Sequence, residues 1–573
     1  MALSNLIISL FAGKPLLARL TASSGLAILL HHGVLRRGEW HLWAPNLLSA
    51  WLLLAAGVLA AEVALAEQGG MLASAVNAGC TVVAFTATVF ASMAAYRLGF
   101  HGLRKFPGPR AAAVSKLWHS WQCRGGKNYL VLDKLRSEYG DFVRTGPNEV
   151  TIFDPEALIK LDGPGNRSIK SDWYDFLMPD MGVTTIRNKA FHDQRRKVWT
   201  LAFSAKALPW YEQQMVEHAT KLESLISEAA RETKPVHFGS LAYWFSFDVM
   251  GMFALAKSFN MLHDEQWHYA IVNLRRAMAI LGPLSAVPWL AQIGFKFLKG
   301  YWVVKDWHSM TGWCRERMQE RIKMDEEGTS IASYLIADAK SRDAVAEEHH
   351  LLTGEAIVAI VAGSDTVAPT LVFLFYQLAR NPALAEKLRH ELQGINPHNL
   401  EALRQLPFLN ALINETLRLH PAVPTGGYRD SPPEGCTIGG RFIPGNTTIV
   451  APRYSIFRCK SYLFLFVAPL FYFRMEASET CYRDANDFIP ERWTSRPELV
   501  KDSRSFLPFA QGRYTCLGKA LALSELRVVT ALLVSKYRIR FPHGEVGESV
   551  ERDLRDQFTA APGNLDLVFE ALG

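Results

Sequence analysis

A single cysteine lies in a glycine-flanked turn near the C-terminal end of the chain, immediately before a segment with helical character. The turn covers residues 509–518 (FAQGRYTCLG). Backbone N–H groups at the start of a helix point toward a sulfur placed there and lower the pKa of its thiol, so Cys516 suits a thiolate that binds a metal ion. Gly512 and Gly518 would let the backbone pass close to a flat group. Taken alone, the turn is equally compatible with a structural cysteine.

Two upstream segments carry an acid and two arginines in a fixed order. Residues 408–420 (FLNALINETLRLH) have apolar residues at helical spacing, and Glu415 and Arg418 share one helix face at i,i+3. Arg492 follows in residues 488–493 (FIPERW). A lone Glu-x-x-Arg pair is common and predicts only a solvated ion pair. Because the second arginine and the cysteine turn follow in this order, chance is a poor explanation.

A third segment, residues 357–379, is almost wholly apolar and yet contains Ala-Gly-Ser-Asp-Thr at positions 362–366. Burying the acid Asp365 and the hydroxyl of Thr366 costs free energy, so a buried helix that keeps them is expected to use them. Pro369 removes a backbone donor and is expected to kink or loosen this helix. The alternative interpretation is a capping acid in a core helix.

The three segments, in this order, resemble the cytochrome P450 family of heme-thiolate monooxygenases over about residues 105–573. The resemblance implies a mainly α-helical fold with a small β part and a heme b whose iron is bound by the Cys516 thiolate. It makes Gly363 the residue that leaves room for dioxygen and assigns proton delivery to Asp365 and Thr366. The remaining implied roles are the ligand loop of Phe509, Gly512 and Gly518 and a buried structural ion network of Glu415, Arg418 and Arg492.

Cationic partners for the heme propionates are expected at residues 191–196 (FHDQRR), where His192 and Arg196 share a helix face at i,i+4. The resemblance adds Arg429. It also shows one departure, because Tyr514 stands where the family pattern has arginine and Arg513 comes one residue earlier. His192, Arg196 and Arg429 are therefore expected to carry more of the propionate binding. The neighbouring Arg195 and Lys197 fit an ordinary basic surface.

The first hundred residues predict a membrane anchor, residues 1–104, ahead of a catalytic domain, residues 105–573. Residues 46–66 and 74–96 are each apolar and long enough to cross a bilayer. Basic residues precede and follow the pair but do not lie between them, which predicts a hairpin with both flanks in the cytosol. Residues 16–34 are a weaker candidate, either interfacial or a third span. The family resemblance implies the endoplasmic reticulum membrane, with the catalytic domain facing the cytosol.

Residues 459–474 (CKSYLFLFVAPLFYFR) form an apolar insert where the family has a short polar connection. The insert is too short for a comfortable membrane span. Removing it joins two segments that together resemble the family, and Phe-Arg is repeated at its two edges. One hypothesis is therefore a retained intron. The alternative is a genuine apolar loop that touches the membrane.

Charge and motifs limit the partners. A net charge of +7 over 573 residues is mild and gives no nucleic-acid footprint. Because no dinucleotide-binding fingerprint or flavin-binding half follows the cysteine turn, electrons are expected from NADPH through a separate NADPH-cytochrome P450 reductase. The apolar pocket segments of the family predict a hydrophobic small-molecule substrate, with Trp173, Tyr174, Val423 and Phe558 as candidate wall residues.

The expected activity is the hydroxylation or epoxidation of a hydrophobic organic substrate with O2. The sequence is similar to that of membrane-bound P450 enzymes of filamentous-fungal secondary metabolism, including indole-alkaloid hydroxylases. Two alternatives remain open. One is a heme-thiolate isomerase or dehydratase, which needs neither O2 nor a reductase. The other is a non-catalytic membrane heme protein or a catalytically impaired splice product.

Overall fold

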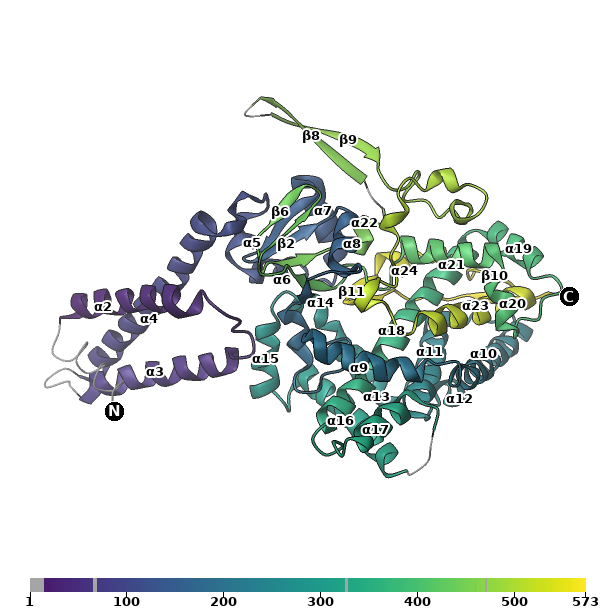
Figure 1. Cartoon of the computed structure of the whole chain (residues 1–573), viewed down its shortest axis with the longest axis horizontal. Coiled ribbons are helices and arrows are strands. Elements are labelled where there is room, and N and C mark those ends of the chain that lie inside the picture. Colours follow the sequence, from purple (N-terminus) through teal and green to yellow (C-terminus); the bar gives the residue numbers. More distant parts are fainter. Residues whose placement is uncertain (1–14, 65–69, 325–327, 459, 469–470, 573) are drawn as a thin grey trace. The chain divides into compact units, whose positions relative to one another are not determined.

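The chain is described by a computed structural model that covers residues 15–64, 70–324, 328–458, 460–468 and 471–572 (Figure 1). These residues divide into two compact units. The first combines Met1–His119, Arg144–Asn148 and Ala286–Lys299. The second contains the rest of the chain. The division expected from the sequence, residues 1–104 and 105–573, stays a prediction about which part anchors and which part catalyses.

Three long helices dominate the first unit: α2 (Leu16–Leu30), α3 (Ala44–Ala64) and α4 (Met71–Ala95). Both α2 and α3 pack against α4. A π-helical turn, η1 (His31–Leu35), extends α2, and a second, η2 (Tyr96–Phe100), extends α4. The shorter elements are η3 (Gly102–Lys105), α5 (Arg110–Val114) and α15 (Pro288–Phe297), and α6 (Lys116–Gln122) leads into the second unit.

Burial separates apolar helices that face outward from apolar helices that form the core. Four helices of the described part are long and apolar enough to cross a membrane. Ala44–Ala64 and Met71–Phe100 contain most of the two predicted spans, and only 6% and 17% of their most apolar windows are buried. The other two, Phe238–Leu255 and His349–Arg380, are 78% buried in the second unit, so their apolar sequence serves core packing.

The second unit is built around α18 (His349–Arg380), which is buried along most of its length. Its neighbours are α11 (Phe238–Leu255), α16 (Trp302–Lys323), α21 (Pro407–Leu419) and α23 (Lys519–Lys536). A long helix of this kind is apolar all round because protein surrounds it. The other helices are α7 (Asn128–Tyr139), α8 (Glu156–Asp162), α9 (Lys189–Ala202), α10 (Leu208–Arg231), α12 (Met261–Asp264), α13 (Tyr269–Ala279), α14 (Leu281–Leu284), α17 (Ile331–Ser341), α19 (Pro382–Glu391), α20 (Leu400–Arg404), α22 (Arg453–Ile456) and α24 (Ser549–Arg552).

Short strands make up the β part. The main sheet has the order β1-β2-β7-β4-β3, with β2 parallel to β7 and with β4 antiparallel to both β7 and β3. Its strands are β1 (Phe142–Gly146), β2 (Glu149–Ile152), β3 (Ile169–Lys170), β4 (Tyr428–Asp430) and β7 (Thr448–Val450). The pairs are β5 (Cys436–Ile438) with β6 (Arg441–Ile443), β10 (Tyr537–Arg540) with β13 (Val568–Ala571), and β11 (Arg555–Gln557) with β12 (Thr559–Ala561). The predicted mainly helical fold with a small β part is confirmed.

The predicted insert, residues 459–474, falls largely on a β-hairpin. Strand β8 (Lys460–Ala468) pairs antiparallel with β9 (Phe471–Glu479), and Leu465 lies opposite Phe473. Figure 1 shows this hairpin extending away from the helices of the second unit. Positions 459, 469 and 470 lie outside the described residues. The retained-intron hypothesis stays a prediction, and an antiparallel hairpin is the form that the translated insert takes.

Candidate active site

The cysteine turn is closed by its own backbone. The short 3₁₀ helix η8 (Gly512–Tyr514) precedes Cys516, whose N–H donates to the carbonyl oxygen of Phe509 over 2.9 Å. The backbone N–H groups of Gly518 and Lys519 donate to the Cys516 sulfur, at the point where α23 begins. The turn therefore aims two donors at a single free thiol.

The two glycines of the turn differ in what they permit. Gly512 has a φ of +62°, and a Cβ there would lie 2.4 Å from the carbonyl oxygen of Asp162, so only glycine fits. A Cβ at Gly518 would meet no heavy atom within 4 Å. There is consequently open space above Gly518, as a flat group next to this backbone would require.

The environment of Cys516 is that of a side chain lining a hollow. The residue is exposed by surface area, yet protein surrounds the sulfur closely enough for burial to be the main influence on its pKa. Burial raises the pKa of the thiol, and the N–H groups of Gly518 and Lys519 and the charge of Arg196 act in the opposite direction. Burial prevails and the pKa is raised. Binding of a metal ion would favour the thiolate form of this buried thiol, because the thiolate is the form that binds metals.

The polar segment of α18 opens at Ala362, which is exposed in an otherwise buried helix. The hydroxyl of Thr366 donates to the carbonyl oxygen of Ala362 over 2.9 Å. Gly363 faces elsewhere, since a Cβ there would lie 2.3 Å from the Met250 sulfur of α11. The residue at the opening is therefore Ala362, and the oxygen-accommodating role of Gly363 stays a prediction. Burial raises the pKa of Asp365 to about 6, and Arg275 opposes this shift.

The structure brings Glu415, Arg418 and Arg492 together as one network, and all three side chains are fully buried. Glu415 Oε1 accepts from Arg418 Nη2 and from Arg492 Nε, each over 2.8 Å. The indole N–H of Trp493 and the backbone N–H of Ile489 complete the carboxylate's partners at 2.9 Å each. Burial acts to raise the pKa of Glu415, but the bond from Arg418 and the two guanidinium charges outweigh it, so the pKa lies below its usual range.

On α9, His192 is buried and Arg196 is half-buried. Burial, followed by the charge of Lys170, lowers the pKa of His192 to about 4, so at neutral pH this side chain contributes an N–H donor rather than a charge. Burial lowers the pKa of Arg196, while an ionised Cys516 and Asp193 act to raise it. Arg196 is thus near enough to the cysteine turn for the two charges to interact.

Arg429 of β4 lies beside Tyr514 of the cysteine turn. The Arg429 guanidinium lies 4.5 Å from the centre of the Tyr514 ring and donates to the hydroxyl of Tyr174 over 2.9 Å. Its Nε donates to Asp162 over 3.0 Å. Burial disfavours the charge of Arg429, but Asp162 and Tyr174 keep its pKa raised. The His192 ring also contacts Tyr514, with the two ring centres 5.2 Å apart.

Lys170 of β3 also lies near Tyr514, and the sequence did not predict its role. Its side chain is 3% exposed, its ammonium donates to the carbonyl oxygen of Val183 over 3.0 Å, and it lies 5.1 Å from the centre of the Tyr514 ring. Burial, reinforced by the charge of Arg429, lowers the pKa of Lys170 well below its usual range. A single lysine on a two-residue strand leaves no signal in the sequence that marks it as functional.

Two nearby arginines have structural partners. Arg513 lies one position before Tyr514 and pairs with Asp193 over 2.9 Å. Arg195, which the sequence placed on an ordinary basic surface, is 1% exposed and was interpreted wrongly. It bonds Glu355 of α18 over 3.2 Å and Asp338 of α17 over 3.1 Å, because a buried guanidinium needs paired carboxylates. Lys197 is exposed, as expected.

The residues fit a heme. We call Lys170, Arg196, Arg429, His192 and Tyr514 the cationic cluster. It gathers guanidinium and ammonium groups with N–H or O–H donors near the cysteine turn. Burying a lysine without an anion is costly, so this cluster suits the two carboxylates of a heme. The exposed Cys516 sulfur and the open space at Gly518 suit its iron and its flat ring.

Among the candidate substrate contacts, Trp173 and Phe558 meet directly. Their rings stack with centres 4.5 Å apart, and Tyr428 stacks on Trp173 at 5.4 Å. Phe558 has a φ of +72° in the turn between β11 and β12, which a bulky residue rarely adopts. Tyr174 instead points its hydroxyl to Arg429, which places it beside the cationic cluster. Val423 is half-buried.

A family model described as cytochrome P450 matches residues 107–462 and 470–569. The chain belongs to the cytochrome P450 family. The match leaves out residues 463–469, which lie inside the predicted insert, so the P450 pattern is interrupted where the hairpin occurs.

Curated relatives of this P450 are fungal. It is 35% identical over 545 residues to tryprostatin B 6-hydroxylase of Aspergillus fumigatus, and this match covers 92% of each chain. It is 33% identical to the cytochrome P450 monooxygenase notG' of Aspergillus versicolor, over 98% of this chain and 99% of that protein. Among solved structures, the crystal structure of the cytochrome P450DA heme domain matches with a TM-score of 0.64 at 16% identity, over 82% of this chain and 98% of that chain. The chain is thus an oxidoreductase of the P450 monooxygenase class.

Proposed function

We propose that the chain is a membrane-bound heme-thiolate monooxygenase that inserts one oxygen atom of O2 into a C–H bond or double bond of a hydrophobic organic substrate. One observation carries the proposal. The Cys516 sulfur is an accessible free thiol that receives two backbone N–H bonds, inside a stretch that the P450 model matches. No other cysteine of the described part combines these features, because Cys123, Cys314 and Cys481 are buried, Cys80 lies on α4 and Cys436 lies on β5.

Each residue of the site has a task toward the heme. The Cys516 thiolate would bind the iron, and Lys170, Arg196 and Arg429 would neutralise the two carboxylates while His192 and Tyr514 donate to them. When bound, the heme supplies the redox chemistry that activates O2. Gly512 lets the cysteine turn pack closely against the backbone of Asp162, and Gly518 leaves open space beside the turn.

Asp365 and Thr366 are proposed to move protons. A carboxyl group with a pKa of about 6 holds and releases a proton near neutral pH, which suits proton transfer. The Thr366 hydroxyl donates to Ala362, so its oxygen lone pairs remain able to accept a proton from water or from a neighbouring acid. Pro369 also removes the N–H that would bond the carbonyl of Asp365, which leaves this turn of α18 looser without breaking the helix.

The heme assignment is tested with the purified protein and its Cys516→Ala variant. The parent should give the long-wavelength reduced-CO band of a thiolate-bound heme, because the axial sulfur sets that position. Cys516→Ala should lose the band, while the matched control Cys436→Ala should keep it, since Cys436 lies on β5 and not in the cysteine turn. A normal band and normal turnover in Cys516→Ala would refute the proposal.

The monooxygenase reaction is tested by NADPH-dependent O2 uptake with an added flavoprotein reductase. An isomerase or dehydratase would instead convert its substrate without NADPH and O2. Thr366→Ala should keep the heme spectrum but divert at least half of the electrons to peroxide, because proton delivery would be impaired. Unchanged coupling of NADPH use to product would remove Thr366 from the proton path.

Substrate class and location complete the proposal. The similarity to tryprostatin B 6-hydroxylase and other fungal monooxygenases supports a hydrophobic substrate of fungal secondary metabolism. The exposed apolar helices α3 and α4 support attachment to the endoplasmic reticulum membrane, with the catalytic unit in the cytosol beside an NADPH-cytochrome P450 reductase. Product profiling of a strain that lacks the gene, compared with one that carries it, would identify the missing oxidised compound.

A further inference from the structure

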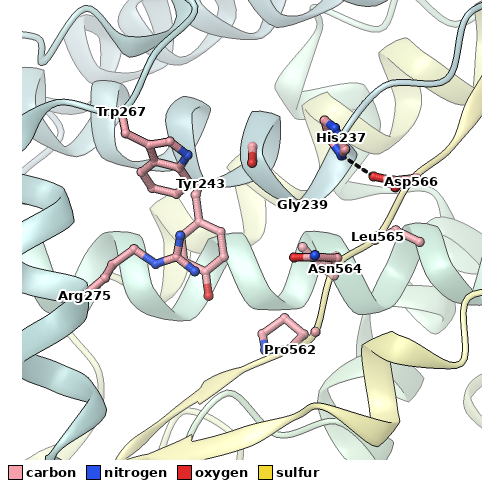
Figure 2. Close-up of a pocket in the computed structure, with 12 residues that line it drawn as sticks. His237, Gly239, Tyr243, Trp267, Arg275, Pro562, Asn564, Leu565 and Asp566 are labelled. Carbon is pink, nitrogen blue, oxygen red and sulfur yellow. Dashed lines mark hydrogen bonds and ion pairs between the residues drawn. The ribbon is translucent and has the colours of Figure 1, made fainter.

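A cavity of about 250 Å³ lies in the second unit beside α11, α13 and residues 562–566, and it is called the α11–α13 cavity here (Figure 2). About half of its lining residues carry polar side chains. They include His237, Tyr243, Trp267, Arg275, Asn564 and Asp566. None of these residues belongs to the cationic cluster or to the cysteine turn described above.

The cavity is open to water at His237. This side chain is 81% exposed, and its Nδ1 lies 2.5 Å from Asp566 Oδ1. Water needs polar partners as well as room, and the Asn564 amide, the Asp566 carboxylate and the Tyr243 hydroxyl offer them. At about 30 Å³ for each molecule, several waters fit.

Arg275 lines the cavity and lies against two aromatic rings. Its guanidinium carbon lies 4.4 Å from the centre of the Tyr243 ring and 4.5 Å from that of Trp267 (Figure 2). The centres of these two rings lie 6.1 Å apart, so both rings attract the same cation and hold it in place, while its N–H groups stay able to bond water. The charge therefore stands at a defined place in the cavity wall.

The contact between α11 and α18 links this wall to Asp365. The Ser246 hydroxyl donates to the carbonyl oxygen of Ser364 over 3.2 Å, and the Ser364 hydroxyl donates back to that of Ser246 over 3.3 Å. Tyr243 lies one helical turn before Ser246, and Asp365 directly follows Ser364. The cavity residue Val372 comes seven residues after Asp365, so it lies two turns along the same face, about 10 Å away.

Charge effects agree with this placement. Burial raises the pKa of Asp365, and the charge of Arg275 is the influence that lowers it. Burial also raises the pKa of Tyr243, to which the charge of Asp365 adds. Among the described residues, the charged group that acts on Asp365 is therefore Arg275 of α13, and Asp365 in turn acts on Tyr243 of α11. His237 and Asp566 also line the cavity.

We propose that the α11–α13 cavity is the route by which protons from solvent reach Asp365, with Tyr243 and Arg275 as its positioning residues. The inference rests on the proposed monooxygenase function. Each turnover takes one O2, two electrons from the reductase and two protons; one oxygen atom enters the product and the other leaves as water. Asp365 releases a proton from its carboxyl oxygen toward Thr366 and recovers one from water in the cavity.

The first test measures the protonation of Asp365 directly. In the resting heme-loaded protein, the carboxyl stretching band that Asp365→Asn removes is followed by infrared difference spectroscopy against pH. Because a nearby cation favours the carboxylate, Arg275→Gln should move the titration midpoint upward by about one pH unit. The control Arg276→Gln, an exposed neighbour on α13, should leave it unchanged. No shift in Arg275→Gln, or an equal shift in the control, would overturn the route.

The second test blocks the cavity. Ser240→Phe places a ring among its lining residues and should raise both the solvent deuterium isotope effect and the fraction of NADPH lost to peroxide at least twofold, with heme content and the CO spectrum unchanged. Unaltered coupling in a variant with normal heme content would overturn the route. A shifted infrared titration in a protein that takes up no O2 would instead overturn the monooxygenase function itself. Normal O2 uptake with an unshifted titration would overturn the α11–α13 route alone.

Discussion

At the scale of single residues, Lys170 compensates for the positive charge that is lost because Tyr514 stands where the family has arginine. The Lys170 ammonium and the Arg429 guanidinium both lie near the ring of Tyr514, at 5.1 and 4.5 Å from its centre. A third strong cation at position 514 would add like-charge repulsion in a buried place. The chain therefore keeps positive charge for the heme carboxylates but supplies part of it from β3 rather than from the cysteine turn.

Replacing Lys170 should loosen the heme without unfolding the chain. Lys170→Met removes a buried charge-assisted hydrogen bond worth about 1.5–3 kcal/mol, so heme transfer to an acceptor such as apomyoglobin should be roughly 10- to 100-fold faster. The transfer rate is followed by absorbance. The control Lys206→Met, on an exposed surface, should behave as the parent. Equal rates in Lys170→Met and the parent would exclude Lys170 from the propionate site.

Restoring the family residue at position 514 should be harmful as long as Lys170 is present. Tyr514→Arg should lower the free energy of unfolding by about 1–3 kcal/mol, since it places a charge beside Lys170 and Arg429. Adding Lys170→Met should recover at least half of that loss. Urea unfolding of both single variants and the double variant gives the interaction energy. A fully stable Tyr514→Arg protein would contradict the proposed compensation.

At the scale of elements, the Glu415 network ties α21 to the chain before α23. Arg418 reaches the carbonyl oxygens of Phe457, Ala485 and Asp487 in addition to Glu415. All three side chains of the network are fully buried, so the fold tolerates their charges only while each donor and acceptor is paired. The network therefore fixes the segment that leads to Cys516.

Breaking this network should destabilise the protein strongly. Glu415→Ala leaves two buried guanidinium groups without their carboxylate and should cost about 3–5 kcal/mol of unfolding free energy. Thermal unfolding monitored by circular dichroism checks this. Glu401→Ala, which removes an exposed partner of Arg404 on α20, should change the free energy by less than about 1 kcal/mol. Because the pKa of Glu415 is lowered in the fold, its contribution should be present at neutral pH and lost as the pH falls through that lowered pKa.

The sequence predicted those elements whose residues lie in one short segment and missed those assembled from distant ones. The Glu-x-x-Arg helix, the apolar helix around Asp365 and the cysteine turn could be recognised because helical periodicity and turn chemistry are local. The sequence could not predict the roles of Lys170 and Arg275, because their partners lie on other elements. It could not predict that Arg195 is buried, because its partner Glu355 lies more than 100 residues away along the chain. Which side of α18 is open likewise depended on Met250 of α11.

The hairpin formed by β8 and β9 should be dispensable. An isolated two-stranded hairpin of apolar sequence has little stability of its own and offers two strand edges for aggregation. Deleting residues 459–474 should therefore raise the yield of soluble, heme-loaded protein at least twofold, judged by the CO difference spectrum after detergent extraction. Sequencing the mature transcript tests its origin: a message without these codons supports a retained intron. If every message contains them and the deletion abolishes heme binding, the hairpin is a genuine part of the fold.

At the scale of the whole molecule, the N-terminal helices α2, α3 and α4 have the contacts of a three-helix bundle rather than of a two-helix hairpin. Arg19, near the start of α2, pairs with Glu62, near the end of α3. His31, at the other end of α2, bonds Ser92 near the end of α4 over 2.8 Å. Thr88 and Ser24 meet between these two points at 3.1 Å. The pairs place α2 parallel to α4 and antiparallel to α3, as three successive spans require.

This arrangement predicts that the N-terminus faces the lumen of the endoplasmic reticulum. The helical segment Leu16–Leu35 is about 30 Å long at 1.5 Å per residue, which equals the hydrocarbon thickness. A glycosylation acceptor fused ahead of Met1 should therefore be modified, whereas one placed after Gly573, beyond the catalytic unit, should not. Exchanging Arg19 and Glu62 should preserve this pattern because the ion pair survives, while Arg19→Glu alone brings two acids together and should reduce modification at least twofold. Gel shifts with and without glycosidase measure both, and an unmodified N-terminal acceptor in the parent would restore the two-span hairpin.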